Sequence, residues 1–329
     1  MDNPGTVLST LALTSAIKYS FSLVSWKQKK KKYELIGKVS EINTYPIKSC
    51  GGFGLYSADA TRLGIRVNGL YDRHWLVVKP NGDFLTMRQY PQLALIETRV
   101  EKDDLVVMAS GMTDLRIPLR PPSDRSKLRR CRVWENQLQG QDCGDEVSQW
   151  FSEYLKTEGI RLLFSAPELM KVQTESKQHP WGNIVASPGD QAGYQDECCG
   201  YLIMNQQSLD ELNRKLVEPV TFDRFRPNLV IDGAPPFDED TWQELAIGEQ
   251  LNVRILEPCA RCQLATINPE KGGKSEDGEP LKTLRRMRCK EKYGNFPLFG
   301  VLAAVDEEGP INIGDPVYVL RKPQQDITV

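Results

Sequence analysis

The chain has 329 residues, of which 40% are hydrophobic and 26% charged, so it is long enough for two domains and has the composition of a soluble globular protein. Its 42 basic and 44 acidic side chains give a net charge of −2, which excludes the overall positive field typical of nucleic-acid-binding proteins. Two histidines are too few for a histidine-rich metal centre, and eight unevenly spaced cysteines are too few for a secreted disulfide scaffold, which indicates a reducing compartment.

The N-terminal segment has the pattern of a membrane anchor. Residues 7–26 are mostly apolar, and about 20 such residues suffice to span a bilayer. The basic run at residues 27–32 follows this stretch and Asp2 precedes it, whereas a cleaved secretory signal carries its positive charge first. We therefore expect an uncleaved anchor and basic linker in residues 1–32, with the body on the cytosolic side. The alternative is a solvated tail, because Lys18 interrupts the apolar stretch.

The first half of the body is predicted to be β-rich because apolar and polar residues alternate along it. Apolar residues between Val39 and Ile47 predict a strand with one irregularity, and residues 75–78 predict a buried strand. The segments 93–100 and 105–109 predict a hairpin.

Helical periodicity predicts two helices further along the chain. One follows Asp142, and the other begins at Ser208, where Glu211 completes a capping box. The segment between them, residues 179–190, is rich in proline and glycine and predicts an irregular connection. We therefore divide the body near residue 170 into two domains, residues 33–170 and 171–329.

The second domain returns to strands. Apolar runs at residues 229–231 and 251–256 predict two strands, and the polar segment 267–281 predicts a loop. The second of these strands leads directly into the run Cys259-Ala260-Arg261-Cys262.

Cys262 is the strongest candidate for a soft metal ligand in a chain with two histidines. The spacing of Cys259 and Cys262 also fits half of a structural zinc site, a redox-active dithiol or two inert buried cysteines. A zinc site lacks a second pair at suitable spacing, and a dithiol of the thioredoxin type lacks the helix that should start at the motif. The residues alone leave these readings open.

Polar pairs upstream of this motif suggest an anion-binding site. Arg226 and Asn228 flank Pro227, so both side chains can point to one side of an extended segment and recognise a phosphate and a pterin edge. The alternative is a strand-entry salt bridge and a turn asparagine. The pair Lys48-Ser49 and Arg73 have the same ambiguity.

These residues, in this order along the chain, resemble the MOSC-domain family, and within it the mitochondrial amidoxime-reducing components. The resemblance extends from about residue 36 to 320. Further matching motifs are Asp72-Arg73-His74-Trp75-Leu76-Val77, Arg88-Gln89-Tyr90-Pro91, Cys131-Arg132-Val133, Asp142-Cys143-Gly144, Pro297-Leu298-Phe299-Gly300 and Gly314-Asp315-Pro316-Val317-Tyr318.

One stretch departs from the family pattern. Tyr194-Gln195-Asp196 matches a Tyr-x-Asp motif, but Glu197-Cys198-Cys199-Gly200 replaces the small or hydroxyl residues that should follow. The resemblance therefore carries over to Asp196 but not to contacts from residues 197–199. The sequence alone also allows a stray thiol near the site at Cys198 or Cys199.

The resemblance implies an α+β, β-rich fold with an N-terminal MOSC β-barrel-like domain, a MOSC-core β-barrel domain and a few peripheral helices. It also implies a molybdenum–molybdopterin cofactor, held in the second domain, with Cys262 as the metal ligand. Asp196 would border the open face of the metal and carry protons, although a plain turn carboxylate is the alternative on sequence alone. The residues predicted to bind the cofactor are Lys48, Ser49, Arg73, Arg226, Asn228 and Arg261.

The implied activity is the reduction of N-hydroxylated compounds such as amidoximes, hydroxylamines and N-oxides, with nitrite as a further candidate. No Gly-x-Gly-x-x-Gly follows a predicted strand, so we expect no nicotinamide or flavin site and expect electrons to come from a partner. By resemblance the partners are cytochrome b5 and NADH-cytochrome b5 reductase, on the cytosolic face of the mitochondrial outer membrane. The basic segments 125–130 and 282–290 are candidate docking patches or merely solvated charge.

Two other classes of function remain open at this point. The first is a non-catalytic molybdenum-cofactor carrier or sulfur-transfer MOSC protein, which would use the same pocket. The second is a membrane-tethered scaffold with structural cysteines, which would bind no molybdenum.

Overall fold

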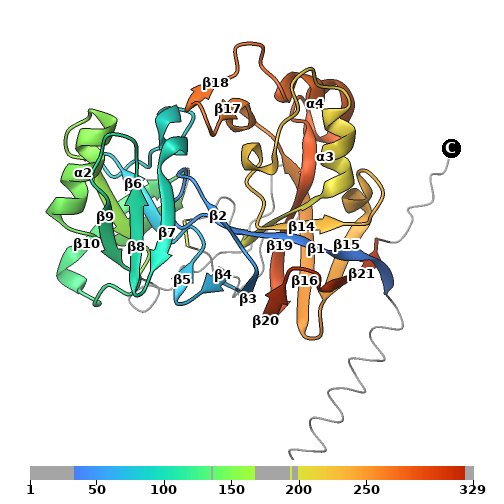
Figure 1. Cartoon of the computed structure of the whole chain (residues 1–329), viewed down its shortest axis with the longest axis horizontal. Helices are drawn as coiled ribbons and strands as arrows, with labels where there is room; N and C mark the ends of the chain where they lie inside the picture. The colour runs from blue at the N-terminus through green and yellow to red at the C-terminus, as the bar shows by residue number, and fades with distance from the viewer. Residues whose placement is uncertain (1–32, 135, 167–192, 195–198, 323–329) are drawn as a thin grey trace, which may run out of the picture.

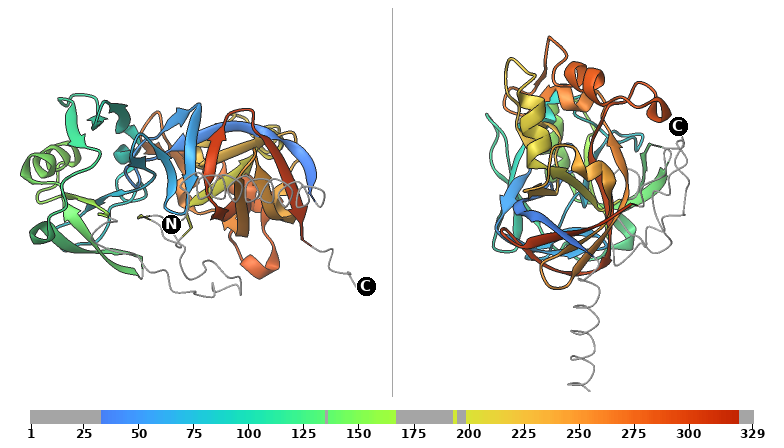
Figure 2. Two further views of the ribbon diagram at one scale, coloured as in Figure 1. Left: turned by 90° about the horizontal axis from the view of Figure 1, so that it is seen from below. Right: turned by 90° about the vertical axis from the view of Figure 1, so that its right-hand side faces the viewer.

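The structure, a computed structural model, describes residues 33–134, 136–166, 193–194 and 199–322. The expected anchor, the domain boundary near residue 170 and Asp196 lie outside these residues. Within them, no helix is long and apolar enough to cross a membrane. The described residues form two β-rich halves side by side with a few short helices, which confirms the predicted α+β class (Figures 1 and 2).

The second half is a closed barrel of seven strands. The strands pair in the order β14-β13-β19-β16-β15-β21-β1, and β1 pairs back with β14 to close the ring. Alternate side chains, such as Val39 and Val253, fill the interior with a hydrophobic core. The strands are β1 (Glu34–Thr44), β13 (Tyr201–Asn205), β14 (Leu229–Asp232), β15 (Trp242–Ile247), β16 (Leu251–Ala260), β19 (Leu298–Glu307) and β21 (Pro316–Arg321).

Strand β1 connects the two halves. It comes early in the chain, yet it pairs with β14 and β21 of the barrel (Figure 1). The predicted irregularity is confirmed, because the register with β14 shifts between Val39 and Glu41. Gly37 is required here, since a Cβ at this position would lie 2.0 Å from the Asp232 carbonyl oxygen. After β1 the chain enters the first half with the loop that carries Lys48.

The first half consists of small antiparallel sheets packed with helix α2 (Asp145–Leu155) around Trp75 and Phe151, which are both fully buried. These sheets have the orders β10-β11-β12-β6 and β7-β8-β9, and β2 pairs with β1. A further sheet of order β20-β3-β4-β5 packs against the barrel core through Ala60, Ile65 and Ile311. The strands are β2 (Phe53–Leu55), β3 (Ser57–Thr61), β4 (Gly64–Val67), β5 (Leu70–Tyr71), β6 (Trp75–Val78), β7 (Glu97–Glu101), β8 (Asp104–Met108), β9 (Leu115–Pro118), β10 (Leu128–Val133), β11 (Asn136–Asp142), β12 (Arg161–Phe164) and β20 (Gly309–Asn312).

These elements confirm most of the expectations for the first half. The buried strand at residues 75–78 is β6, the helix after Asp142 is α2, and the hairpin forms between β7 and β8. Only the start of the hairpin differs, because residues 91–95 form a 3₁₀ turn before β7 begins. Pro91 favours this turn, since it fixes φ at the first helical position.

Helix α3 (Gln206–Asn213) confirms the second predicted helix but not its predicted cap. The cap is Asn205, whose side chain accepts from the Gln207 amide at 3.1 Å. Ser208 lies inside the helix and donates instead to the buried carboxylate of Glu239 at 2.8 Å. The predicted capping box is therefore wrong, because a tertiary partner takes the hydroxyl.

Four further elements follow the end of β16. The 3₁₀ turn at Gln263–Thr266 comes directly after Cys262, and α4 (Leu281–Arg288) packs against it. The predicted loop at residues 267–281 contains the two short paired strands β17 (Ile267–Asn268) and β18 (Gly273–Lys274).

Candidate functional site

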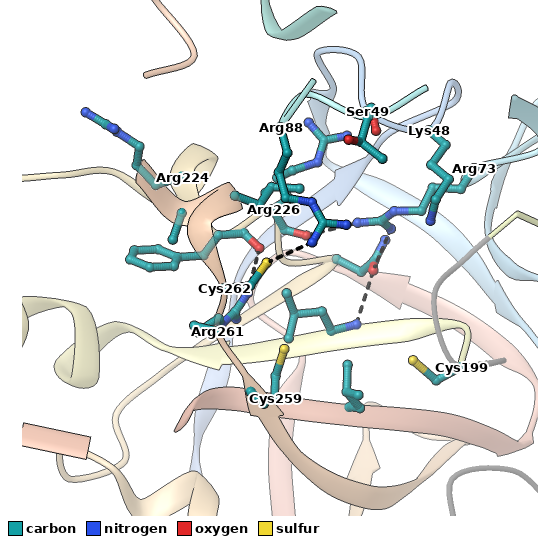
Figure 3. Close-up of a pocket in the computed structure, with 18 of the residues that line it drawn as sticks. Lys48, Ser49, Arg73, Arg88, Cys199, Arg224, Arg226, Cys259, Arg261 and Cys262 are labelled. Carbon is teal, nitrogen blue, oxygen red and sulfur yellow. Dashed lines mark hydrogen bonds between the residues drawn. The ribbon is translucent and has the colours of Figure 1, made fainter. Parts of the chain in front are cut away.

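A cavity of about 380 Å³ is lined by residues from both halves of the molecule (Figure 3). Six of its lining side chains are basic, and among the described lining residues none is aspartate or glutamate. The cavity therefore presents a positive field to any ligand. The basic residues are Lys48, Arg73, Arg88, Arg224, Arg226 and Arg261.

Cys262 lies at this cavity, two residues beyond the end of β16. Its backbone is extended and its side chain is partly exposed, so the sulfur is accessible. The Arg88 guanidinium points toward it, with Nη1 3.8 Å from the Cys262 sulfur (Figure 3). Cys259, the penultimate residue of β16, also lines the cavity. A positive charge thus lies beside an accessible thiol.

The protein alone offers few metal ligands at this place. Within the described residues, no group of three or more His, Cys, Asp or Glu side chains could hold a metal ion. The zinc reading of Cys259 and Cys262 therefore gains no second pair from that part of the chain. A metal at Cys262 would need most of its ligands from the molecule that carries it.

Arg226 is a buried cation whose hydrogen-bonding capacity is not used up. Its side chain is 8% exposed, and Nη2 has no hydrogen-bond partner. Burial, followed by the charge of Arg73, lowers the pKa of Arg226 to about 10, so the group remains protonated at neutral pH. The guanidinium lies 4.2 Å from the centre of the Tyr45 ring. An unpaired, desolvated cation that lines a cavity indicates an anionic ligand.

Arg73 and Asn228 are joined by a hydrogen bond between their side chains. Arg73 makes an ion pair with the fully buried Asp72, and it donates to the Asn228 side-chain oxygen and the Arg226 carbonyl, both at 3.2 Å. The same Asn228 oxygen accepts from the Leu202 amide at 3.2 Å. Asn228 therefore mainly positions the Arg73 side chain, by hydrogen bonds that connect the two halves.

Lys48 and Ser49 also line the cavity, in the loop after β1, and both are buried. The Lys48 amide donates to the Trp75 carbonyl at 2.9 Å, which ties this loop to β6. Ser49, Arg73 and Arg226 all have positive φ, at 70°, 55° and 60°. Non-glycine residues adopt this conformation at an energetic cost, and such strain gathers at functional sites.

Arg261 also lines the cavity, but its donors serve the protein framework. Its Nε donates to the Phe299 carbonyl at 2.7 Å and its Nη1 to the Phe225 carbonyl at 3.1 Å. Nη2 lies 3.4 Å from the Met204 sulfur. Arg261 therefore anchors the segment that presents Cys262.

The cavity includes residues that the sequence did not single out. Arg88 lay within a quoted motif, and Arg224 lies two residues before Arg226, so position in the chain was the available signal. Trp134 follows a hairpin strand and gave no signal. Cys199 is buried and lines the cavity, as the idea of a stray thiol near the site anticipated. Asp196 and Cys198 lie outside the described residues.

Comparison with known proteins adds the following similarities. The MOSC N-terminal beta barrel domain matches residues 36–158, and the MOSC domain matches residues 190–318. "Mitochondrial amidoxime reducing component 2" of Bos taurus is 39% identical over 295 residues, which cover 88% of this chain and 85% of the bovine chain. The human protein of the same name is 37% identical and covers 89% and 87%. Human "Mitochondrial amidoxime-reducing component 1" is 34% identical and covers 95% and 92%.

Proposed function

The chain belongs to the mitochondrial amidoxime-reducing component family of MOSC-domain proteins, and from this membership we propose that it binds a molybdenum–molybdopterin cofactor and reduces N-hydroxylated compounds. The observation that carries the proposal is the accessible thiol of Cys262 at a cavity whose charged lining residues are all basic. A thiolate is a soft donor suited to a metal that a dithiolene already holds, and a phosphate-bearing pterin meets the surrounding cations.

The residues at the cavity fit this cofactor. The unpartnered Nη2 of Arg226 requires an acceptor, which a phosphate oxygen supplies. Lys48 and Ser49 come from the other half of the molecule and line the same cavity, so they could add contacts to the same phosphate. Arg73, fixed by Asp72 and Asn228, would orient the pterin ring.

The reaction converts an amidoxime to an amidine and water and consumes two electrons and two protons. When bound, the cofactor would supply the two electrons that the cleavage of the N–O bond consumes. Arg88 keeps a positive charge beside the Cys262 sulfur. We assign proton delivery to the carboxyl group of Asp196, directly or through water, on the strength of the Tyr-x-Asp motif.

Electrons in this proposal pass from NADH through cytochrome b5 reductase and cytochrome b5 on the mitochondrial outer membrane, with the body facing the cytosol. The names of the relatives as mitochondrial components and the apolar stretch at residues 7–26 support this location. Deletion of residues 1–32 should release an active body from membranes, as measured by fractionation and turnover. A truncated protein that still sediments with membranes contradicts the anchor.

The test of the function uses the full-length chain purified in detergent. Molybdenum content and benzamidoxime reduction are measured on one sample with NADH, cytochrome b5 and its reductase. Metal with turnover is the expected result. Metal without turnover, even with reduced methyl viologen as donor, would support the carrier function instead. A folded, cofactor-supplied preparation without molybdenum would refute the proposal.

A further inference from the structure

Two exposed aromatic side chains line the cavity, one from each half of the molecule. Trp134, after β10, is 41% exposed, and Phe296, before β19, is 49% exposed. Six large hydrophobic side chains are exposed among the described residues, and two of the six lie at this one cavity. Grouped exposed aromatic surface marks a binding site more often than scattered residues do.

Trp134 is held in place although it is partly exposed. The Arg88 guanidinium lies 4.4 Å from the centre of the indole ring, and the Phe84 ring packs edge-on against it at 4.9 Å. Trp134 also has a φ of 52°, which is uncommon for a bulky residue. Since Arg88 also reaches the Cys262 sulfur, the indole is positioned relative to the proposed metal ligand.

Phe296 is tied to the other side of the same motif. Its amide donates to the Tyr293 carbonyl at 3.3 Å. The next residue, Pro297, accepts from the Arg261 amide at 2.8 Å, and Arg261 directly precedes Cys262. The indole of Trp134, through Arg88, and the backbone of Phe296, through Pro297 and Arg261, are thus linked to the segment that presents the sulfur.

We propose that Trp134 and Phe296 are specificity-determining residues that favour N-hydroxylated substrates attached to a planar aromatic group. This proposal rests on the proposed function. The basic lining attracts anions and gives a neutral aromatic compound no advantage, whereas two aromatic faces bury a flat ring and stack against it. A small, hydrophilic N-hydroxy compound gains nothing from either ring. The site should therefore discriminate by what is attached to the reacting group.

The test compares benzamidoxime with acetamidoxime, which share the reacting group and differ in the ring. The full-length, cofactor-loaded protein is assayed with reduced methyl viologen, so that no protein partner has to dock. Trp134→Ala combined with Phe296→Ala should lower kcat/KM for benzamidoxime about tenfold, mainly through KM, the size expected for the loss of two aromatic contacts. The value for acetamidoxime should stay within about twofold.

Matched variants separate stacking from general damage. Tyr56→Ala removes an aromatic ring that is 88% exposed but does not line the cavity, and it should change neither substrate. Trp134→Phe keeps an aromatic face and should restore most of the preference. Molybdenum content should be unchanged in all variants. Calorimetry with benzamide, a neutral analogue that cannot be reduced at nitrogen, should show weaker binding to the double variant.

Three outcomes would overturn the proposal. Equal losses for both amidoximes would mean that the rings act on the cofactor or on Arg88. Unchanged kinetics with methyl viologen, but slower turnover with cytochrome b5, would make the rings a docking surface. Benzamide affinity that is the same in the wild type and the double variant would exclude stacking. If the wild-type protein reduces neither amidoxime, the proposed function fails, and benzamide binding still decides the role of the rings.

Discussion

Arg226 and Arg261 are two buried cations that differ in how their hydrogen-bond donors are used. Both arginines are 8% exposed and line the same cavity. Arg261 donates to two backbone carbonyls and reaches a methionine sulfur, whereas Nη2 of Arg226 has no partner. Burial therefore does not distinguish a structural cation from a ligand-binding one. A count of hydrogen-bond donors and acceptors does.

The backbone follows the same division. Arg226, Arg73 and Ser49 have positive φ, so the proposed anion-binding wall is conformationally strained. Cys262 instead follows strand β16, which pairs with β19 through a register that shifts at three places, and its own backbone is extended. The proposed metal ligand therefore has an unstrained backbone, whereas the residues proposed to hold the anion have a strained one, as preorganised binding sites often do.

Cys262→Ser should have the largest effect, because it removes the sulfur that the protein is proposed to give the metal. We expect reduction of benzamidoxime to be abolished while the unfolding transition stays close to that of the wild type. Circular dichroism and turnover measure these two quantities. Cys289→Ser, at an exposed cysteine, is the matched control and should remain active. Wild-type turnover in Cys262→Ser would remove the metal assignment.

Arg261→Met tests whether the hydrogen bonds of Arg261 stabilise the fold. The carbonyls of Phe299 and Phe225 would lose a charged donor inside the protein, which should lower the free energy of unfolding by roughly 3 kcal/mol. Urea denaturation of the protein prepared without cofactor measures this change. A variant as stable as the wild type would show that these bonds contribute little and that the contrast with Arg226 is not real.

Glu239 tests whether an unpartnered buried atom always marks a ligand site. Its Oε1 lacks a partner, but it does not line the cavity, and burial raises its pKa to about 7. Because the folded pKa exceeds the ordinary value of 4.5, stability should be full below about pH 4.5 and decline as pH rises through 7.

The expected decline between pH 5 and 7 is roughly 2 kcal/mol. Urea denaturation at several pH values measures it, and Glu239→Gln should remove this part of the slope. A slope that the variant leaves unchanged would mean that Glu239 is ionised in the folded protein. The distinction from Arg226 would then fail.

Arg226→Met should have the smallest effect on the stability of the protein and a moderate effect on its affinity for the cofactor. Removing a buried, unpaired charge is expected to leave the protein without cofactor as stable as the wild type or more so. Retention of molybdenum after dialysis should fall about tenfold, the size of one lost charge-assisted contact. Loss of stability equal to that of Arg261→Met would contradict the comparison.

The local elements of the fold could be predicted from the sequence, because they depend on patterns within a few residues. The alternation around β6 and the helical spacing in α2 were sufficient. The closure of the barrel by β1 was not, since nothing near residues 34–44 reveals a partner about 190 residues away at β14. The prediction of the α3 cap was wrong for the same reason, because Glu239, which takes the Ser208 hydroxyl, is distant from it in sequence.

The site was partly predictable for a related reason. Lys48, Ser49, Arg73, Arg226, Asn228, Arg261 and Cys262 were found through the order of motifs, and the structure brings all seven to one cavity. The separate roles of these residues could be assigned only from the structure. The sequence cannot show that the hydrogen-bond donors of Arg261 have partners while Nη2 of Arg226 has none. Trp134 and Phe296 emerged only from three-dimensional proximity and exposure.

The most direct test of the central claim is X-ray absorption at the molybdenum edge on the wild-type protein and on Cys262→Ser loaded with cofactor. If Cys262 binds the metal, the variant should lose one sulfur from the first coordination shell and keep the remaining sulfur ligands. An identical sulfur shell in both proteins would show that Cys262 does not bind the metal and would contradict the account.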